Sequence, residues 1–119
     1  MDEQKLIEAF QLMWGKYPEQ VRLIRKDHTI VAGNESYLRF GGPVGTKCNV
    51  GDPSMHAGCR AIESLKAGET KTVAHEIEGE KYESFWVSVA GTADYYVHFT
   101  NGMNALLAKM AAQQPPRES

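Results

Sequence analysis

The residues best suited to chemistry lie in one short stretch, Gly45 to Arg60, which holds both cysteines and one of the four histidines. Cys48, His56 and Cys59 are residue types that bind metals, and thiolates also carry redox chemistry. His56 and Cys59 are three positions apart, so at the start of a helix their side chains could converge on one point. The stretch therefore predicts a metal or iron-sulfur site, a thiol redox pair, or two small buried thiols without chemistry.

A metal site in this stretch needs one more ligand. Structural zinc usually takes four ligands, whereas Cys48, His56 and Cys59 supply three. In the alternative without chemistry, the two cysteines are small apolar core residues and His56 belongs to a surface loop. The fourth ligand would be water, a residue of a partner chain, or one of the remaining histidines, which are His28, His75 and His98.

A redox function without metal is the second chemical hypothesis. Cys59 would lie near a helix N-terminus beside Arg60 and close to His56, and this environment favours the thiolate. Such a thiolate could form a reversible disulfide with Cys48.

As a catalytic nucleophile, Cys59 lacks an oriented third group, and the chain has no phosphate-binding glycine loop, no Ser-His-Asp order and no paired carboxylates. The sequence therefore predicts that the protein is not an enzyme.

Composition limits the class of protein. The chain has 119 residues, of which 42% are hydrophobic, enough for one compact domain with its own core. Its net charge of −2 is spread along the sequence, which disfavours nucleic-acid binding. No apolar run approaches the ~20 residues of a membrane span, and the opening MDEQK lacks the pattern of a signal peptide. We therefore expect a cytoplasmic protein with no nucleic-acid or membrane partner.

An amphipathic helix and a hairpin open the chain. Apolar residues at helical spacing predict a helix from Asp2 to Trp14, with Asp2 as its N-cap and Gly15 at its end. Two β-rich runs, Val21 to Ile24 and Thr29 to Val31, flank a polar turn and predict a hairpin. The apolar stripe of the helix needs a partner surface, which is either its own sheet or the same helix of a second chain.

Short helices flank the central stretch. Asn34 is placed to cap a helical piece, ESYLRF, that ends before Pro43. The central stretch is loop-like up to Pro53, because its glycines and prolines disfavour regular structure. Helical spacing resumes near Cys59, and Gly68 fits a C-terminal cap.

Three strands follow, at Lys71 to Ile77, Tyr82 to Ala90 and Asp94 to Thr100. Trp86 and Tyr96 lie on one face of these strands, and we expect the opening helix to cover that face. Alternation directs the other apolar set toward the core, namely Phe85, Val87, Val89, Tyr95, Val97 and Phe99.

The order of these elements resembles that of a PAS domain. VRLIRKDHTIVAGNESYLRFGG looks like the opening hairpin and first short helix of that family, and SLKAGE resembles the helix end before its third strand. FTNGMNALL takes the place of the Asp-Ile-Thr motif that leads into the signalling helix, with His98 where the family has Asp. The resemblance covers residues 18 to 108. It implies an α+β fold, with a five-stranded antiparallel sheet, short helices on one face and amphipathic helices at both termini.

The resemblance divides the chain into parts of a single PAS domain, residues 1–119. These are an N-terminal helix (1–16), a PAS core (18–101), a C-terminal helix (102–112) and a frayed tail (113–119). The implied function is sensory signalling: the domain binds a small ligand between helices and sheet, where His75 and His98 are candidate contacts, and forms a homodimer through its terminal helices. A histidine kinase or another signalling effector is the implied partner. A ligand-free structural dimerisation module is an alternative.

The central stretch resembles a subset of PAS domains in bacterial sensor kinases that carry Lys-Cys and then Cys-x-x-Cys. VGTKC supplies the first part, and His56 replaces the first cysteine of the later pair. This implies, as a further alternative, a metal, iron-sulfur or thiol redox sensor through Cys48, His56 and Cys59. Flavin is not expected, because GTKCN departs from the Gly-x-Asn-Cys-Arg run of light-sensing PAS domains and YESFWVSV lacks their Asn pair. Haem is not expected either, because a lone histidine is more often structural, so the identity of the cofactor stays open.

Overall fold

The computed structural model describes residues 2–47, 64, 66–77, 79–102, 105 and 108. Its helices and strands are, in chain order, α1 (Glu3–Trp14), β1 (Val21–Arg25), β2 (Ile30–Gly33), α2 (Glu35–Arg39), β3 (Lys71–Ile77), β4 (Glu80–Ser88) and β5 (Tyr95–Asn101). Their bounds differ from the predicted ones by at most two residues. None of the described helices is long and apolar enough to cross a membrane.

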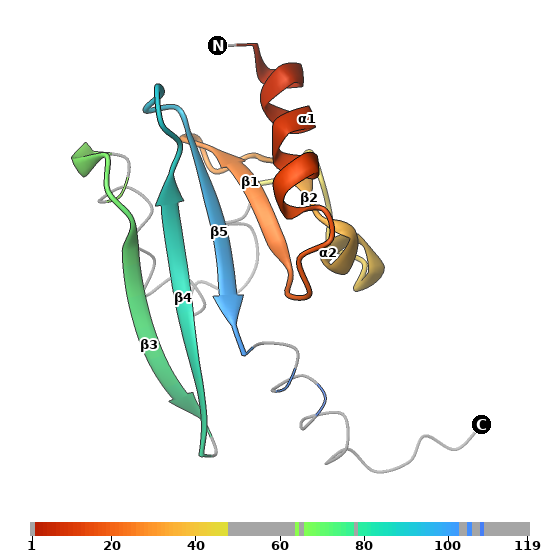
Figure 1. The fold of residues 1–119 in the computed structure, drawn as a ribbon, viewed down its shortest axis with the longest axis vertical. Coiled ribbons are helices and arrows are strands. Elements are labelled where there is room, and N and C mark those ends of the chain that lie inside the picture. Colours follow the sequence, from red (N-terminus) through yellow and green to blue (C-terminus); the bar gives the residue numbers. More distant parts are fainter. Residues whose placement is uncertain are drawn as a thin grey trace.

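The five strands form one antiparallel sheet in the order β2-β1-β5-β4-β3 (Figure 1). The first hairpin and the last three strands meet where β1 pairs with β5, with Val21 opposite Phe99 and Leu23 opposite Val97. Strands that are far apart in the sequence are therefore neighbours within the sheet. The predicted α+β fold with a five-stranded antiparallel sheet is confirmed.

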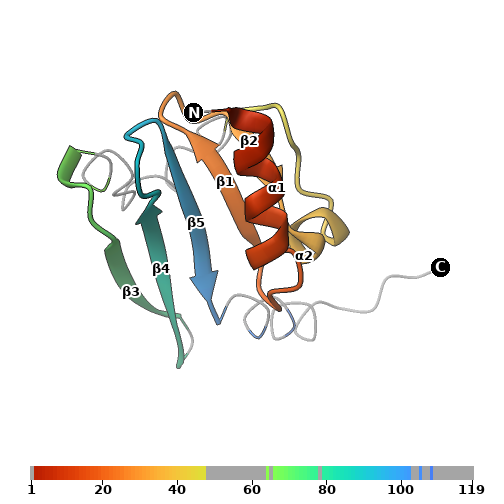
Figure 2. The ribbon, with the colours of Figure 1, turned by 45° about the horizontal axis from the view of Figure 1, so that its top comes forward.

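α1 lies across one face of the sheet, over β1 and β2 (Figure 2). Phe10 is buried in this layer with Leu23, Val97 and Phe99. Phe85 stacks on Phe99 with ring centroids 4.9 Å apart, which extends the apolar layer to β4. The partly buried side chains around it that come from α1 are Leu6, Ile7 and Trp14. The predicted apolar stripe of the opening helix is therefore used on its own sheet.

The face that α1 covers differs from the prediction. The opening helix was expected over Trp86 and Tyr96, but both rings lie on the other face and are buried there with Tyr37 of α2. The physical reason is that Tyr37 of α2 already covers that face, so the apolar stripe of α1 is buried on the face that α2 leaves open, against Leu23, Val97 and Phe99.

Asn34 joins α1, β1 and α2. Its side chain is fully buried, and its Oδ1 accepts hydrogen bonds from the backbone N–H groups of Val21 and Tyr37, each at 3.0 Å. The predicted cap of the short helix is confirmed, but the amide does more than cap. Its Nδ2 donates to three carbonyl oxygens, those of Trp14 (3.2 Å), Tyr17 (3.1 Å) and Glu19 (2.8 Å).

The linker after α1 is bonded to the end of β5. Tyr17 Oη donates to Asn101 Oδ1 at 2.7 Å, and the N–H of Gly102 donates to Glu19 Oε1 at 3.2 Å. Gly102 has φ +92°, and a Cβ there would lie 3.0 Å from the carbonyl oxygen of Lys81, so glycine is required at this turn. The chain leaving α1 and the chain leaving β5 are therefore tied directly to each other.

Other predicted ends are also present. Asp2 Oδ1 accepts from the N–H of Gln4 at 3.0 Å, as expected for the N-cap of α1. Gly68 has φ +63°, and its N–H donates to the carbonyl of Ser64 at 2.9 Å, which confirms the predicted C-terminal cap. Of the predicted C-terminal helix, Ala105 and Ala108 are helical, and the rest of 103–119 lies outside the described residues.

Candidate functional site

The residues that the sequence singles out for metal or redox chemistry are Cys48, His56 and Cys59. All three lie outside the described residues. Their role as ligands or as a redox pair therefore stays a prediction. Among the residues that the structure does describe, no three His, Cys, Asp or Glu side chains come close enough together to hold a metal ion.

A histidine, a tryptophan and two cationic side chains form one row across the sheet, on the face opposite α1. Arg22 of β1 is paired with His98 of β5, His98 with Trp86 of β4, and Trp86 with Lys71 of β3. Directly opposed residues of antiparallel strands present their side chains on the same face, about 5 Å apart. We call Arg22, His98, Trp86 and Lys71 the cross-sheet row.

His98 and Trp86 are the centre of the cross-sheet row. Their rings are stacked, with centroids 4.8 Å apart and planes inclined by 10°. His98 Nδ1 lies 2.8 Å from the carbonyl oxygen of Phe85. Because a carbonyl oxygen only accepts, Nδ1 carries the proton of this hydrogen bond. His98, which the sequence predicts as a ligand contact, therefore has a ring orientation that is fixed by its neighbours.

Tyr37 covers the Arg22 end of the row. The guanidinium carbon of Arg22 lies 5.8 Å from the centroid of the Tyr37 ring, within the range of a cation–π contact. The ring packs directly on Gly33 and Gly42, where a Cβ would approach it to 2.2 and 2.3 Å. Gly33 is the residue of β2 paired with Arg22. The Tyr37 ring therefore occupies the space beside Arg22 that a side chain at position 33 would otherwise fill.

Tyr96 and His28 lie beside the row. Tyr96 is 1% exposed, and its Oη lies 3.3 Å from His28 Nδ1. His28 has φ +71°, a left-handed conformation that is uncommon for a residue other than glycine. The turn is held by the carboxylate of Asp27, whose Oδ1 accepts from the N–H of Thr29 at 2.9 Å, and this bond lowers the pKa of Asp27. His28 is thus brought next to the sheet face by a fixed turn.

The second predicted strand histidine, His75, belongs to β3, and its backbone is paired with Tyr82. His98 is paired with Trp86. The two histidines therefore lie at positions four residues apart along β4, a separation of roughly 13 Å at 3.3 Å per residue. The structure does not bring their backbones together at one point.

Similarity to solved structures agrees with this architecture. A sensory box sensor histidine kinase from Vibrio cholerae matches with a TM-score of 0.57 and 11% identity, over 84% of this chain and 93% of that one. The PAS domain of BvgS from Bordetella pertussis matches with a TM-score of 0.54 and 15% identity, over 93% and 96%. A domain of an HTR-like protein from Haloarcula marismortui matches with 0.51 and 16%, over 70% and 95%.

The chain has the PAS fold. The resemblance predicted from the order of elements is confirmed for the fold. No protein-family model matches the sequence, and no curated protein does. On this PAS fold the cross-sheet row occupies the face that α2 borders, and α1 covers the other face.

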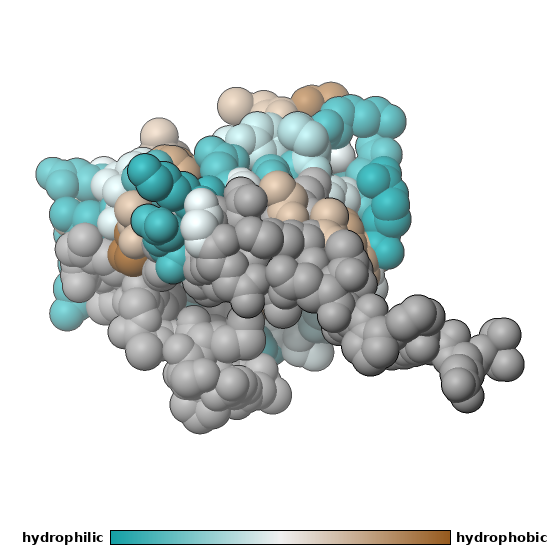
Figure 3. Space-filling model, turned by 90° about the horizontal axis from the view of Figure 1, so that it is seen from below, coloured by the Kyte–Doolittle hydropathy of each residue, from teal (hydrophilic) through white to brown (hydrophobic). Residues whose placement is uncertain are grey.

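A hollow of about 690 Å³ lies on the α1 face, beyond the end of that helix. It is open to solvent, and its lining includes acidic side chains, a lysine and the amide of Asn101. Seen from the end at which β5 leaves the sheet (Figure 3), the described surface is mostly hydrophilic, and its hydrophobic atoms form small separate groups. The residues that line the hollow are Ala74, Glu76, Lys81, Tyr82, Glu83, Asn101 and Gly102.

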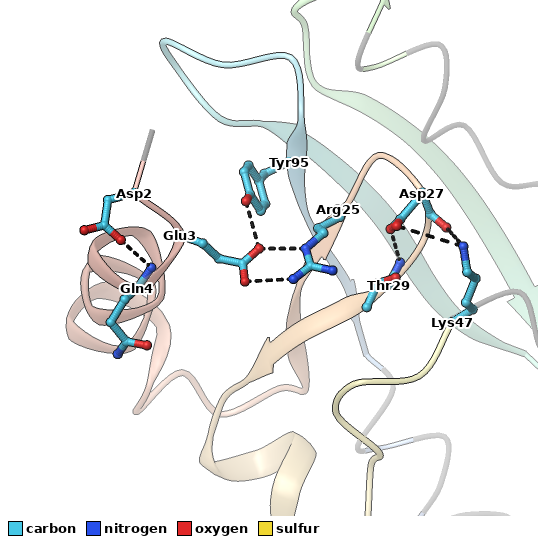
Figure 4. A network of polar contacts seen from close by, with 8 residues as sticks. All are labelled: Asp2, Glu3, Gln4, Arg25, Asp27, Thr29, Lys47 and Tyr95. Carbon is cyan, nitrogen blue, oxygen red and sulfur yellow. Dashed lines mark hydrogen bonds and ion pairs between the residues drawn. The ribbon is translucent and has the colours of Figure 1, made fainter.

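A polar cluster pins the first turn of α1 to the sheet (Figure 4). Glu3 accepts two hydrogen bonds from Arg25, at 2.6 and 2.8 Å, and a third from Tyr95 Oη at 2.8 Å. The bonds from Arg25 and then Tyr95 lower the pKa of Glu3 from 4.5 to about 2, and the same contacts raise the pKa of Arg25 and of Tyr95. Both ends of α1 are thus fixed to the PAS core.

Sequence reasoning missed Arg22, Lys71 and the Glu3 cluster. Arg22 and Lys71 depend on which residues of different strands are opposed, and the Glu3 cluster depends on where α1 packs on the sheet. No local pattern contains either. The only available signal for Arg22 and His98 is that each alternates with buried residues, as in Val97, His98, Phe99. Alternation gives the face of a residue but does not give its cross-strand neighbour.

Proposed function

We propose that this chain is a sensory PAS domain that binds a small ligand on the sheet face carrying His98 and Trp86. The observation that carries the proposal is the fixed stack of these two rings. A stacked imidazole and indole offer an apolar floor with an oriented polar atom, the combination usual in small-molecule sites. The fold is shared with a PAS domain of BvgS and with a sensory box histidine kinase, which supports a signalling role.

The output of this domain passes through its terminal helices. Tyr17 and Glu19, which follow α1, are bonded to Asn101 and Gly102, where the chain leaves β5. His98 lies three residues before Asn101 on the same strand. A shift of β5 on ligand binding therefore has a short route to both ends of the chain. A histidine kinase or another signalling effector is the partner that would receive it.

Two copies associate through the outer side of α1 in this proposal. Leu12 and Met13 are 89% and 77% exposed, although the inner stripe of the same helix is packed on its own sheet. Large apolar residues side by side on a helix surface suit contact with the same surface of a second copy. Light scattering tests this: the wild type runs as a dimer, and Leu12→Glu with Met13→Glu runs as a monomer. A wild type that is monomeric at high concentration contradicts it.

Trp86 provides the test of ligand binding. The chain has two tryptophans, so Trp14→Phe leaves Trp86 as the only one. We expect at least one compound in a panel of small aromatic and aliphatic acids, amides, alcohols and amines to change Trp86 emission and raise the Tm. A ligand at ten times its Kd adds about 1.4 kcal/mol, or roughly 5 °C for a domain of this size. If no compound does either, the domain is the ligand-free dimerisation module.

A further inference from the structure

We infer that the ligand of the cross-sheet row is a small organic anion, a carboxylic acid with a flat apolar part. This inference rests on the proposed function and names the class of molecule that the site selects. It follows from the distribution of charge over the two faces of the sheet and from the environment of Arg22.

The cross-sheet row carries positive charge at both ends. Arg22 is at one end and Lys71 at the other, with the His98–Trp86 stack between them. Arg22 and His98 are partly exposed, so a ligand reaches them without opening the core. Lys71 Nζ is paired with Glu69 at 3.3 Å, and Glu69 is 67% exposed, so Arg22 is the stronger attraction for an anion.

The rows on either side contain no carboxylate. One consists of Val73, Ser84 and Thr100, and the other of Ser88, Tyr96 and Ile24. The hydroxyls of Ser84 and Thr100 are 2.8 Å apart, so one donates to the other and the second O–H is left as a donor for an anion. Glu76 of β3 and Glu83 of β4 point to the α1 face instead, because Glu83 alternates in phase with Phe85 and Glu76 is opposed to Lys81.

Arg22 is a half-buried cation whose surroundings differ from those of Arg25. Within the described part of the chain, no Asp or Glu oxygen lies within ion-pair distance of its guanidinium, whereas Arg25 on the same strand has the bidentate partner Glu3. A half-buried guanidinium is stabilised by a carboxylate, which it binds through two parallel hydrogen bonds. A carboxylate at Arg22 would place an attached ring or chain along Tyr37 and toward the His98–Trp86 stack.

The test uses pairs of compounds that differ only in charge: benzoate and benzamide, phenylacetate and phenylacetamide, butyrate and butyramide. Binding is measured by Trp86 emission in the full chain carrying Trp14→Phe. We expect one of the acids to bind at least 10-fold more tightly than its amide. Arg22→Gln should remove that preference, and Arg22→Lys, which keeps the charge but loses the planar fork, should retain part of it.

Lys81→Gln is the matched control, because Lys81 is an exposed cation of β4 that lies on the α1 face. It removes the same charge from the protein and should leave the preference unchanged. If acids and amides bind equally, or a neutral compound binds and no acid does, the anion inference is overturned while ligand binding stands. If Lys81→Gln lowers the preference as much as Arg22→Gln, net charge and not the row explains it. If nothing in the panel binds, both the inference and the proposed function fail.

Discussion

The two faces of the sheet are built from the same strands but differ in kind. On the α1 face, Leu23, Val97 and Phe99 form an aliphatic and aromatic layer that one helix seals. On the other face, His98 alternates with those residues and stacks on Trp86, which belongs to a second buried cluster with Tyr37 and Tyr96. The comparison teaches that one strand can direct its odd positions into an apolar layer and its even positions toward polar neighbours. Under the proposed function, substitutions should therefore separate stability from binding by face.

The largest effect is expected on the α1 face. Phe10→Ala removes a buried ring from the layer under α1 and should lower the free energy of unfolding by about 3–5 kcal/mol. Glu8→Ala, at an exposed position of the same helix, should change it by less than about 0.5 kcal/mol. Urea denaturation measures both. Equal losses would mean that α1 does not dock on the sheet through Phe10.

Asn34→Ala should have the next largest effect and lower the free energy of unfolding by about 2–4 kcal/mol. Buried backbone N–H and C=O groups lose their partner, and each then costs part of its desolvation free energy. Ser36→Ala is the control. Ser36 is also buried but makes one side-chain bond, to the carbonyl of Pro18, so about 1 kcal/mol is expected. A loss at Asn34 no larger than at Ser36 would show that the joint is not held by the amide.

A substitution at His98, on the face of the cross-sheet row, should cost less stability. His98→Phe keeps a ring on Trp86 but leaves the carbonyl of Phe85 without its donor, at a cost of about 1 kcal/mol. Trp86 emission in the Trp14→Phe background should change clearly, because the imidazole beside the indole is replaced. If His98→Phe lowered the free energy of unfolding as much as Phe10→Ala does, the two faces would not differ in their contribution to stability.

The smallest effect is expected for the partly exposed ion pair of Glu3 and Arg25 at the start of α1. The pKa of Glu3 is about 2 in the folded chain against an ordinary 4.5, so its stabilisation is complete above about pH 4.5 and is lost as pH falls toward 2. Glu3→Gln should be slightly less stable than the wild type at pH 6, and the difference should vanish near pH 2. The side chains of Glu3 and Arg25 are 33% and 40% exposed, so added salt should also shrink it. A difference that stays constant with pH would show that the ion pair does not act.

Local patterns were sufficient for the elements and for the fold class. The spacing of Leu6, Ile7, Phe10 and Trp14, the cap at Asn34 and the glycine at Gly68 each depend on a few neighbouring residues. Backbone hydrogen bonding and side-chain periodicity are local, and the sequence states them directly. The PAS order of elements followed from these assignments. The chemistry first suggested by Cys48, His56 and Cys59 stays a prediction, since those residues lie outside the described part of the chain.

Only the tertiary structure decided which face α1 covers and which residues are opposed across strands. Alternation marks Trp86 and Val97 as inward on opposite faces, but it does not say which face α1 covers and which face Tyr37 of α2 covers. Arg22 and His98 are 76 positions apart in the sequence and adjacent in the sheet. Their pairing exists because β1 enters between β2 and β5, a choice set by long-range burial that no local pattern contains.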